Sequence, residues 1–246
     1  MSVQQYDEIG EAFEGFKGLP VVQYGEVPSF LNMVGDVRGK SVLDLASGTG
    51  FYSREFKRRG ATDVLGIDIS GEMVAVAKAL EEREPLGVRY EVGDAAELRP
   101  LEQRFDVGVA VQLLNYAEDI DAVERMCRNL HRSLAPGAEL FLFNMSPDYD
   151  FGGPSLAKYG FLTELTGEEV EAGLRVRTTA LLDPPVSFVS TFPRREVYEK
   201  CLRTAGFSEL TWVPLEVSDA GVRAFGADFW ADLLANPPLT MLRCRA

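Results

Sequence analysis

The stretch Asp44-Leu45-Ala46-Ser47-Gly48-Thr49-Gly50 joins the end of an apolar run to the start of a helical pattern. The apolar run covers residues 41–45 and the helical pattern covers residues 52–59, so the stretch is predicted to be a strand-to-helix loop. Gly48 and Gly50 permit a tight turn and a close approach of the backbone to a ligand. The start of the following helix adds free amide donors. The sequence therefore predicts a binding loop at the carboxyl end of a strand.

Short runs rich in Val, Leu, Ile and Phe alternate with helical patterns on both sides of this loop. The expected strands are residues 41–45, 64–68, 88–92, 105–111 and 139–144, and the expected helices are residues 52–59, 72–82 and 120–134. Continuous apolar runs are typical of strands that are covered on both faces. Because strand–helix–strand units cross over with one hand, the pattern predicts an α/β fold with a Rossmann-like, doubly wound sheet.

The pattern changes after Asn144. Segments 160–165, 174–182 and 186–192 carry β-forming residues separated by turn residues, which predicts an antiparallel insertion. A helix over 194–205, a strand over 209–217, a short helix ending near Leu234 and a strand over 239–245 follow. We expect seven strands, mostly parallel, with an antiparallel C-terminal strand. The chain is then one domain over 1–246, with a helical cap (1–36), a cofactor-binding core (40–144), an antiparallel lid (148–192) and a C-terminal completion of the sheet (193–246).

The amino-acid composition limits the kinds of molecule that the protein is expected to bind. The 246 residues include 25 basic and 38 acidic side chains, a net charge of −13. Basic residues do not cluster as a nucleic acid or an anionic membrane requires. Three separated cysteines form neither a disulfide framework nor a metal knuckle. With no long apolar run and no leader pattern, we expect a cytoplasmic protein without a membrane partner.

Acidic residues at the strand ends indicate what the loop binds. Asp68 closes the second expected strand, where a carboxylate can accept hydrogen bonds from ribose hydroxyls. A dinucleotide fingerprint would need a third glycine, but Ser53 stands there. Asp44 would repel a pyrophosphate and would suit an amino group. A ligand with an amine and a ribose but no phosphate fits better, and S-adenosylmethionine has both.

These features resemble class I S-adenosylmethionine-dependent methyltransferases. The motifs that carry the resemblance are the loop 44–50, Asp68-Ile69, Gly93-Asp94-Ala95, residues 112–116 after the fourth strand, and Leu134-Ala135-Pro136-Gly137-Ala138. Over nearly the whole chain, Tyr6-Asp7-Glu8-Ile9, residues 17–20, residues 48–54 and Asp183-Pro184-Pro185 are similar to small-molecule methyltransferases of bacterial secondary metabolism. The nearest type is that of toxoflavin-pathway N-methyltransferases.

The resemblance implies a set of site residues. Those that would contact the cofactor are Tyr6, Tyr24, Asp44, Ala46, Gly48, Gly50, Asp68, Ile69, Met73, Asp94, Ala95, Gln112 and Leu113. Fold logic places Tyr116 and Asn144 beside the acceptor, and Phe188 is expected on the floor of the lid. The sequence identifies no catalytic residue and no metal site. His131, the only histidine, lies in a helix that is expected to pack far from the strand ends.

The expected function is methyl transfer from S-adenosylmethionine to a nitrogen or oxygen of a small molecule, with S-adenosylhomocysteine as product, in a natural-product (antibiotic) pathway. In-line displacement at the sulfonium chiefly requires alignment and exclusion of water. The alternatives are a nicotinamide-dependent oxidoreductase and a cofactor-retaining binding or cyclase protein that no longer transfers methyl. The acceptor, the N-, O- or C-type of methylation, the use of a general base and the choice of monomer or homodimer stay open.

Overall fold

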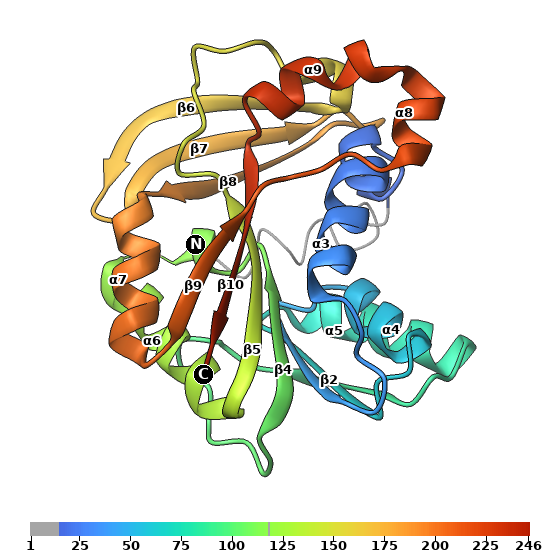
Figure 1. Ribbon diagram of the computed structural model, residues 1–246, viewed down its shortest axis with the longest axis vertical. Coiled ribbons are helices and arrows are strands. Elements are labelled where there is room, and N and C mark those ends of the chain that lie inside the picture. Colours follow the sequence, from blue (N-terminus) through green and yellow to red (C-terminus); the bar gives the residue numbers. More distant parts are fainter. Residues whose placement is uncertain (1–14, 118) are drawn as a thin grey trace.

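The computed structural model describes residues 15–117 and 119–246. A seven-stranded sheet with helices on both faces forms the body, and a three-stranded sheet lies across one of its ends (Figure 1). The large sheet has the order β3-β2-β1-β4-β5-β10-β9. Its strands are β1 (Ser41–Leu45), β2 (Asp63–Asp68), β3 (Val88–Val92), β4 (Phe105–Val111), β5 (Leu134–Met145), β9 (Ser208–Val213) and β10 (Leu239–Arg245). β10 pairs antiparallel with both of its neighbours, β5 and β9, and every other pair of neighbouring strands in this sheet is parallel. This confirms the predicted fold class.

The two faces of the large sheet have separate cores because side chains alternate along each strand. Val42 and Phe143 face α3 (Val27–Val34), α4 (Phe51–Arg58) and α5 (Gly71–Arg83). Leu43 and Leu142 face α6 (Ile120–Ser133) and α7 (Arg195–Ala205). Because alternate residues of each strand face one apolar core or the other, the strands appear in the sequence as continuous apolar runs.

The antiparallel insertion is present as a second sheet. It consists of β6 (Phe161–Val170), β7 (Gly173–Ala180) and β8 (Val186–Pro193), in that order. Figure 1 shows it lying across the carboxyl ends of β4 and β5. β8 contacts both β5 and the short turn η2 (Leu114–Tyr116) that follows β4. The insertion therefore covers the edge at which the predicted binding loop emerges.

Several element bounds differ from the prediction for local reasons. β5 begins at Leu134 rather than near Glu139, because Leu134 already pairs with Phe105 of β4. β9 ends at Val213, directly before Pro214, which lacks the amide that a longer strand would need. The expected short helix before β10 is two helices, α8 (Asp219–Phe225) and α9 (Ala227–Ala235), separated by Gly226 at φ 82°.

The N-terminal helical region also differs from a simple helix. Gly15 and Phe16 are helical, and residues 1–14 of the expected helical cap lie outside the described residues. The rest of the cap begins as a π-helical turn, η1 (Val21–Glu26), and continues as α3, whose C-cap is Gly35. Single π turns inside helices are frequent at functional sites. Elsewhere, η3 (Ala157–Tyr159) precedes β6. Within the described ranges, no helix has the length and apolar character needed to cross a bilayer.

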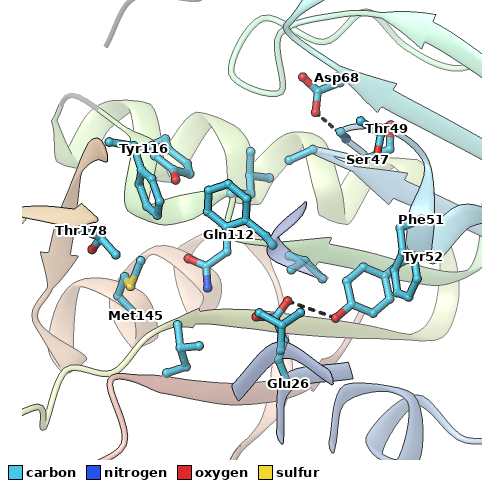
Figure 2. A pocket seen from close by; sticks show the side chains of 18 of the residues that line it. Glu26, Ser47, Thr49, Phe51, Tyr52, Asp68, Gln112, Tyr116, Met145 and Thr178 are labelled. Atoms are coloured by element: carbon cyan, nitrogen blue, oxygen red, sulfur yellow. Dashed lines mark hydrogen bonds between the residues drawn. The ribbon is translucent and has the colours of Figure 1, made fainter. Parts of the chain in front are cut away.

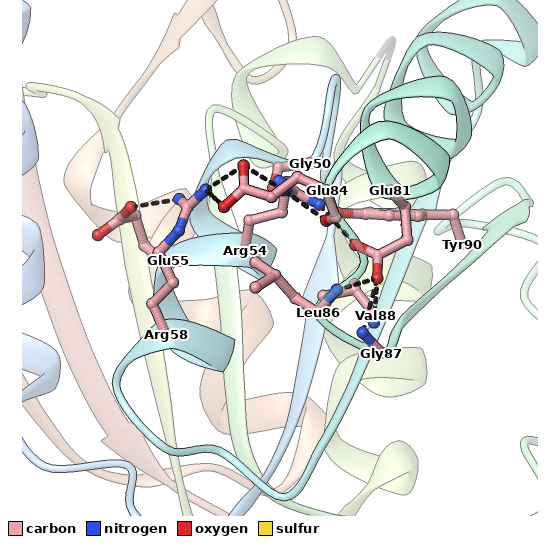
Figure 3. Close-up of polar contacts among 10 residues, drawn as sticks. All are labelled: Gly50, Arg54, Glu55, Arg58, Glu81, Glu84, Leu86, Gly87, Val88 and Tyr90. Carbon is pink, nitrogen blue, oxygen red and sulfur yellow. Dashed lines mark hydrogen bonds and ion pairs between the residues drawn. The ribbon is translucent and has the colours of Figure 1, made fainter.

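A buried arginine ties α4 to α5 beneath the sheet edge (Figure 3). The Arg54 side chain is 6% exposed, and its guanidinium pairs with the carboxylates of Glu81 at 2.5 Å and Glu84 at 2.9 Å. The second oxygen of Glu81 accepts the amides of Leu86 and Gly87, which lead into β3. One charged side chain thus fixes α5 and the start of β3 relative to α4.

Replacing Arg54 should therefore be costly. Arg54→Leu leaves the Glu81 carboxylate without its cation, and such a break in a buried pair lowers the free energy of unfolding by about 3–5 kcal/mol. Arg58→Leu is the matched control, because Arg58 pairs with the same Glu84 from a side chain that is 41% exposed. Its loss should stay below about 1 kcal/mol. Urea unfolding measures both, and an Arg54 variant as stable as the Arg58 variant would contradict this role.

Candidate functional site

A cavity of about 280 Å³ lies between the large sheet and the insertion. Its base is formed by the segments that follow β1, β2, β3 and β4, and η1 closes one side. Residues of β6, β7 and β8 form the opposite wall. Open α/β sheets bind ligands at this position, outside the carboxyl ends of their strands.

Asp68 organises the loop at the base of the cavity. Its carboxylate accepts the amide of Gly48 at 2.7 Å and the amide of Ser70 at 2.9 Å (Figure 2). Ala46 and Gly48 have positive φ values of 66° and 53°, which turn the loop toward the end of β2. Ala46, Gly48 and Asp68 all line the cavity, as the sequence analysis expected of cofactor-binding residues.

Asp44 and Gly50 shape the loop from behind. Asp44 is 1% exposed, and its carboxylate accepts the Ser53 hydroxyl at 2.6 Å. Burial raises the pKa of Asp44 to about 7, and the nearby Asp68 charge adds to the rise. Gly50 has φ 83°, and a Cβ there would stand 2.3 Å from the Tyr90 hydroxyl oxygen. Neither residue lines the cavity, so both would act on a ligand through the loop.

The other expected cofactor residues lie together at one end of the cavity. This group, from the segments after β2, β3 and β4, consists of Ile69, Met73, Asp94, Ala95, Gln112 and Leu113. Met73 is fully buried, whereas Ile69 is 42% exposed although it is apolar. Asp94 accepts the amide of Ala96 at 2.7 Å, which fixes the turn after β3.

Gln112 has an unusual backbone and an unpaired side chain. Its φ is 56°, and its amide donates to the Phe143 carbonyl at 2.7 Å. Its side-chain oxygen Oε1 is buried without a hydrogen-bond partner among the described residues. Figure 2 shows the Gln112 amide inside the cavity. Left-handed backbone at a non-glycine residue costs free energy and clusters at functional sites, so this position is a candidate ligand contact.

Three residues of the insertion form one row on the cavity wall. Thr163 pairs with Thr178 across β6 and β7, and Thr178 pairs with Phe188 across β7 and β8. All three line the cavity, so Phe188, which was expected on the floor of the lid, lies on the cavity wall formed by the insertion. Thr178 is 6% exposed, and its hydroxyl has no partner in the described part of the chain. Tyr116 lies on the same cavity, at the end of η2.

Asn144 lies away from the cavity. β5 continues one residue further than expected, to Met145, and Met145 is the residue on the cavity wall. Side-chain alternation turns Asn144 toward the face of α6 and α7, where it is fully buried. Its amide atoms lack hydrogen-bond partners among the described residues.

Of the two N-terminal tyrosines that were expected at the cofactor, only Tyr24 is among the described residues, and it does not line the cavity. Tyr6 lies outside the described residues. Tyr24 packs against Phe225 and Trp230, with ring centroids 5.7 and 6.3 Å away, and is not a lining residue. Trp230 is fully buried in this cluster, which is therefore part of the core rather than a substrate wall.

Glu26 is a cavity residue that the sequence analysis missed. It ends η1, and its Oε1 accepts the Tyr52 hydroxyl at 3.2 Å (Figure 2). The cavity lining from the same segment of the chain is apolar and includes Val22 and Val27. Phe51, at the start of α4, also lines the cavity. Burial raises the pKa of Glu26 to about 7. The signal in the sequence was that Glu26 is the only charged residue within the segment 21–34.

His131 and Asp148 both have ordinary structural surroundings. The His131 ring packs edge-on against Phe207, 5.0 Å away between centroids. Asp148 forms an ion pair with Arg195. In the parts of the chain that the structure describes, His, Cys, Asp and Glu do not gather in groups of three or more that could hold a metal ion.

Asp44 and Glu26, the two carboxyl groups with raised pKa values, should lower the free energy of unfolding as the pH rises. Because the folded state holds the protons of Asp44 and Glu26 more tightly than the unfolded chain does, the stabilisation is complete below about pH 4 and is lost as the pH rises through about 7. Glu26→Gln removes one of these titrations and should raise the free energy of unfolding at pH 8 by about 1–3 kcal/mol relative to the wild type. The exposed Glu168→Gln is the control. Urea unfolding between pH 5 and 8 measures this, and parallel pH curves for all three proteins would contradict it.

Comparison with known proteins finds methyltransferases that are similar to part of this chain in sequence. Residues 42–137 match the family described as "Methyltransferase domain". Ubiquinone biosynthesis O-methyltransferase of Coxiella burnetii is 32% identical over 113 residues, which are 46% of this chain and 47% of that protein. N-demethylindolmycin N-methyltransferase of Streptomyces griseus is 28% identical over 174 residues, 69% of this chain and 70% of that protein. The chain thus spans about half the length of the O-methyltransferase that it matches.

A solved structure extends the likeness in fold to nearly the whole chain. The S-adenosylmethionine-dependent methyltransferase of Mesorhizobium loti superposes with a TM-score of 0.66 and 22% sequence identity, over 94% of this chain and 99% of that one. The segment matched in sequence contains the loop after β1, Asp68, Asp94 and Gln112. Residues 42–137 are therefore similar in sequence to a methyltransferase domain, and nearly the whole chain shares the fold of the Mesorhizobium loti structure.

Proposed function

We propose that the protein transfers a methyl group from S-adenosylmethionine to a nitrogen or oxygen atom of a small-molecule acceptor. The observation that carries this proposal is the Asp68 carboxylate at the end of β2, bonded to the Gly48 amide and lining a mainly apolar cavity. A carboxylate in this place suits the ribose of the cofactor. The cofactor supplies an activated methyl group on a sulfonium, which is a good leaving group.

The chain's own residues fit the cofactor in three parts. Asp68 would accept the ribose hydroxyls. Ile69 and Met73 would pack on the adenine, and Asp94 and the Ala95 amide would bond its edge. The methionine end would lie near the Ala46–Gly50 loop and Gln112, whose buried, unpaired Oε1 is an acceptor suited to an ammonium group. The buried carboxyl of Asp44 under this loop favours a cation there over a phosphate.

The acceptor would occupy the part of the cavity beneath the insertion. This wall is mainly apolar, and Phe188 offers a flat surface for a ring. Thr178 and Tyr116 offer hydroxyls that would orient a polar substituent. The relatives named for ubiquinone biosynthesis and for N-demethylindolmycin methylation support a small organic acceptor. We place the protein among bacterial natural-product enzymes of the toxoflavin-pathway N-methyltransferase type.

Alignment and exclusion of water would supply most of the rate acceleration. Methyl transfer needs the nucleophile, the methyl carbon and the sulfur in one line. When the protein binds both reactants in this arrangement, the entropic cost of bringing them together is met on binding and not in the chemical step. The insertion sheet spans the open edge of the large sheet and acts as the lid in this proposal (Figure 1). The apolar lining keeps the reacting atoms from water.

Two observations argue against the alternative function, that of a nicotinamide-dependent oxidoreductase. Ser53 stands where a dinucleotide loop has its third glycine, is fully buried and donates to Asp44. That carboxyl lies directly under the loop, where a pyrophosphate would have to bind. No observation in the structure favours the cyclase alternative over methyl transfer.

Cofactor binding tests the proposal directly. Asp68→Ala should raise the Kd for S-adenosylmethionine by about 10- to 100-fold, because hydrogen bonds to a charged group are worth about 1.5–3 kcal/mol. Asp63→Ala is the matched control at the other end of β2, where the side chain pairs with Arg89 far from the cavity. Titration calorimetry measures both, and an Asp68→Ala isotherm like that of the wild type would refute the site.

A further inference from the structure

Among the described residues that line the cavity, Glu26 is the one carboxyl that the proposed cofactor contacts leave without a role. It belongs to neither the strand ends nor the glycine loop, but projects from η1 on the opposite side of the cavity (Figure 2). The Tyr52 hydroxyl reaches its Oε1 at 3.2 Å, a long distance for an O–H···O hydrogen bond. Tyr52 itself is held by Phe30 and Phe51, with ring centroids 5.1 Å away in both cases.

The described residues supply no cation to Glu26. In the described ranges, no lysine or arginine lies within ion-pair distance of its carboxylate. Besides Glu26 and its partner Tyr52, the titratable side chains on the cavity wall among the described residues are Lys17, Asp68, Asp94, Tyr116 and Tyr159. The Lys17 ammonium lies over the Phe51 ring, 4.5 Å from its centroid. α8 packs against η1, and its Asp219 and Arg223 are exposed to solvent.

A carboxyl in such surroundings responds to any cation that enters the cavity. Burial in an apolar wall disfavours the charged form and raises the pKa of Glu26 to about 7. A positive charge in the same cavity favours the carboxylate and lowers that pKa. S-adenosylmethionine carries a sulfonium cation, whereas S-adenosylhomocysteine has a neutral sulfur. The state of Glu26 would therefore differ between the substrate and product forms of the cofactor.

We propose that Glu26 is the general base of the reaction: its carboxylate faces the sulfonium of S-adenosylmethionine and takes up the acceptor's proton when methyl transfer removes that positive charge. This inference rests on the proposed function and adds a catalytic residue to it. Tyr52 is a positioning residue, which orients the carboxylate toward the cavity through its hydroxyl.

The step balances in atoms and charge. A lone pair on the acceptor's nitrogen or oxygen forms a bond to the methyl carbon, and the electron pair of the S–C bond passes to sulfur. The acceptor's N–H or O–H bond breaks, its electron pair stays on the acceptor atom, and Glu26 receives the proton. Sulfonium and carboxylate are replaced by a neutral thioether and a neutral carboxylic acid. The apolar cavity thus holds no net charge at these two groups before or after transfer, as a water-poor site requires.

Proton linkage tests the first half of this inference without knowledge of the acceptor. Binding of S-adenosylmethionine and of S-adenosylhomocysteine is measured by calorimetry at pH 7, in buffers that differ in ionisation enthalpy. Since Glu26 is about half protonated at this pH, S-adenosylmethionine should release up to about half a proton per site more than S-adenosylhomocysteine. Glu26→Gln should bind both compounds and remove this difference. Tyr52→Phe should keep the difference and shift it to higher pH, because the Tyr52 hydrogen bond lowers the pKa.

The second half is tested on a phenol or heteroaromatic N–H acceptor found by screening with the labelled methyl donor. Loss of kcat toward low pH, with an apparent pKa set by Glu26, should disappear in Glu26→Gln, while kcat at pH 8 falls at least 10-fold and the Kd for S-adenosylhomocysteine stays within a factor of about three. Equal proton release by the two compounds in the wild type, or the same pH profile in the variant, would overturn the inference. A wild-type protein that binds neither compound would instead refute the proposed function.

Discussion

A hydrogen bond of 2.7 Å between the Gly48 amide and the Asp68 carboxylate joins two strand ends, and the geometry of the cavity depends on it. The same carboxylate also receives the Ser70 amide, just before α5, so one side chain positions the loop after β1 and the helix after β2. Asp68 is placed there by the parallel pairing of β1 with β2, which aligns their carboxyl ends. The register of the sheet therefore determines both the conformation of the loop and the position at which a ligand can bind.

Buried carboxyls give the cavity its chemical character. Asp44 lies beneath the loop and Glu26 on the facing wall, and burial raises the pKa of each to about 7. Each costs folding free energy when ionised without a partner, so their retention is easier to understand if a cation completes the site. A cofactor with an ammonium and a sulfonium but no phosphate meets this need. The net charge of −13 fits the same preference, although most of its acidic residues are spread over the surface.

The sequence was sufficient for the large sheet because its strands are apolar on both faces and are separated by recognisable caps such as Ser70, which accepts the Met73 amide. Gly48, Asp68 and Asp94 could be located because each follows a strand end. Side chains beyond these motifs were harder to place. Asn144 faces the core on the α6 and α7 side of the sheet, and Met145, the last residue of β5, reaches the cavity instead. The alternation of side chains along β5, with Phe141 and Phe143 on the other face, would have predicted this.

The N-terminal segment shows a different limit. A π-helical turn changes the angle between successive side chains, so an ordinary helical wheel cannot tell which residue of 21–26 faces the cavity. Tyr24 was expected on the cofactor, but Glu26 lines the cavity instead. The row formed by Thr163, Thr178 and Phe188 depends on the register of three antiparallel strands, which turn geometry sets and composition does not.

A crystal structure of the protein with S-adenosylhomocysteine and a bound acceptor would test the central claim most directly. We predict that both ribose hydroxyls lie within hydrogen-bond distance of the Asp68 carboxylate, and that the sulfur faces the acceptor beneath Thr178 and Phe188. Binding of the nucleoside anywhere other than the cavity, or a ribose without contact to Asp68, would contradict the account.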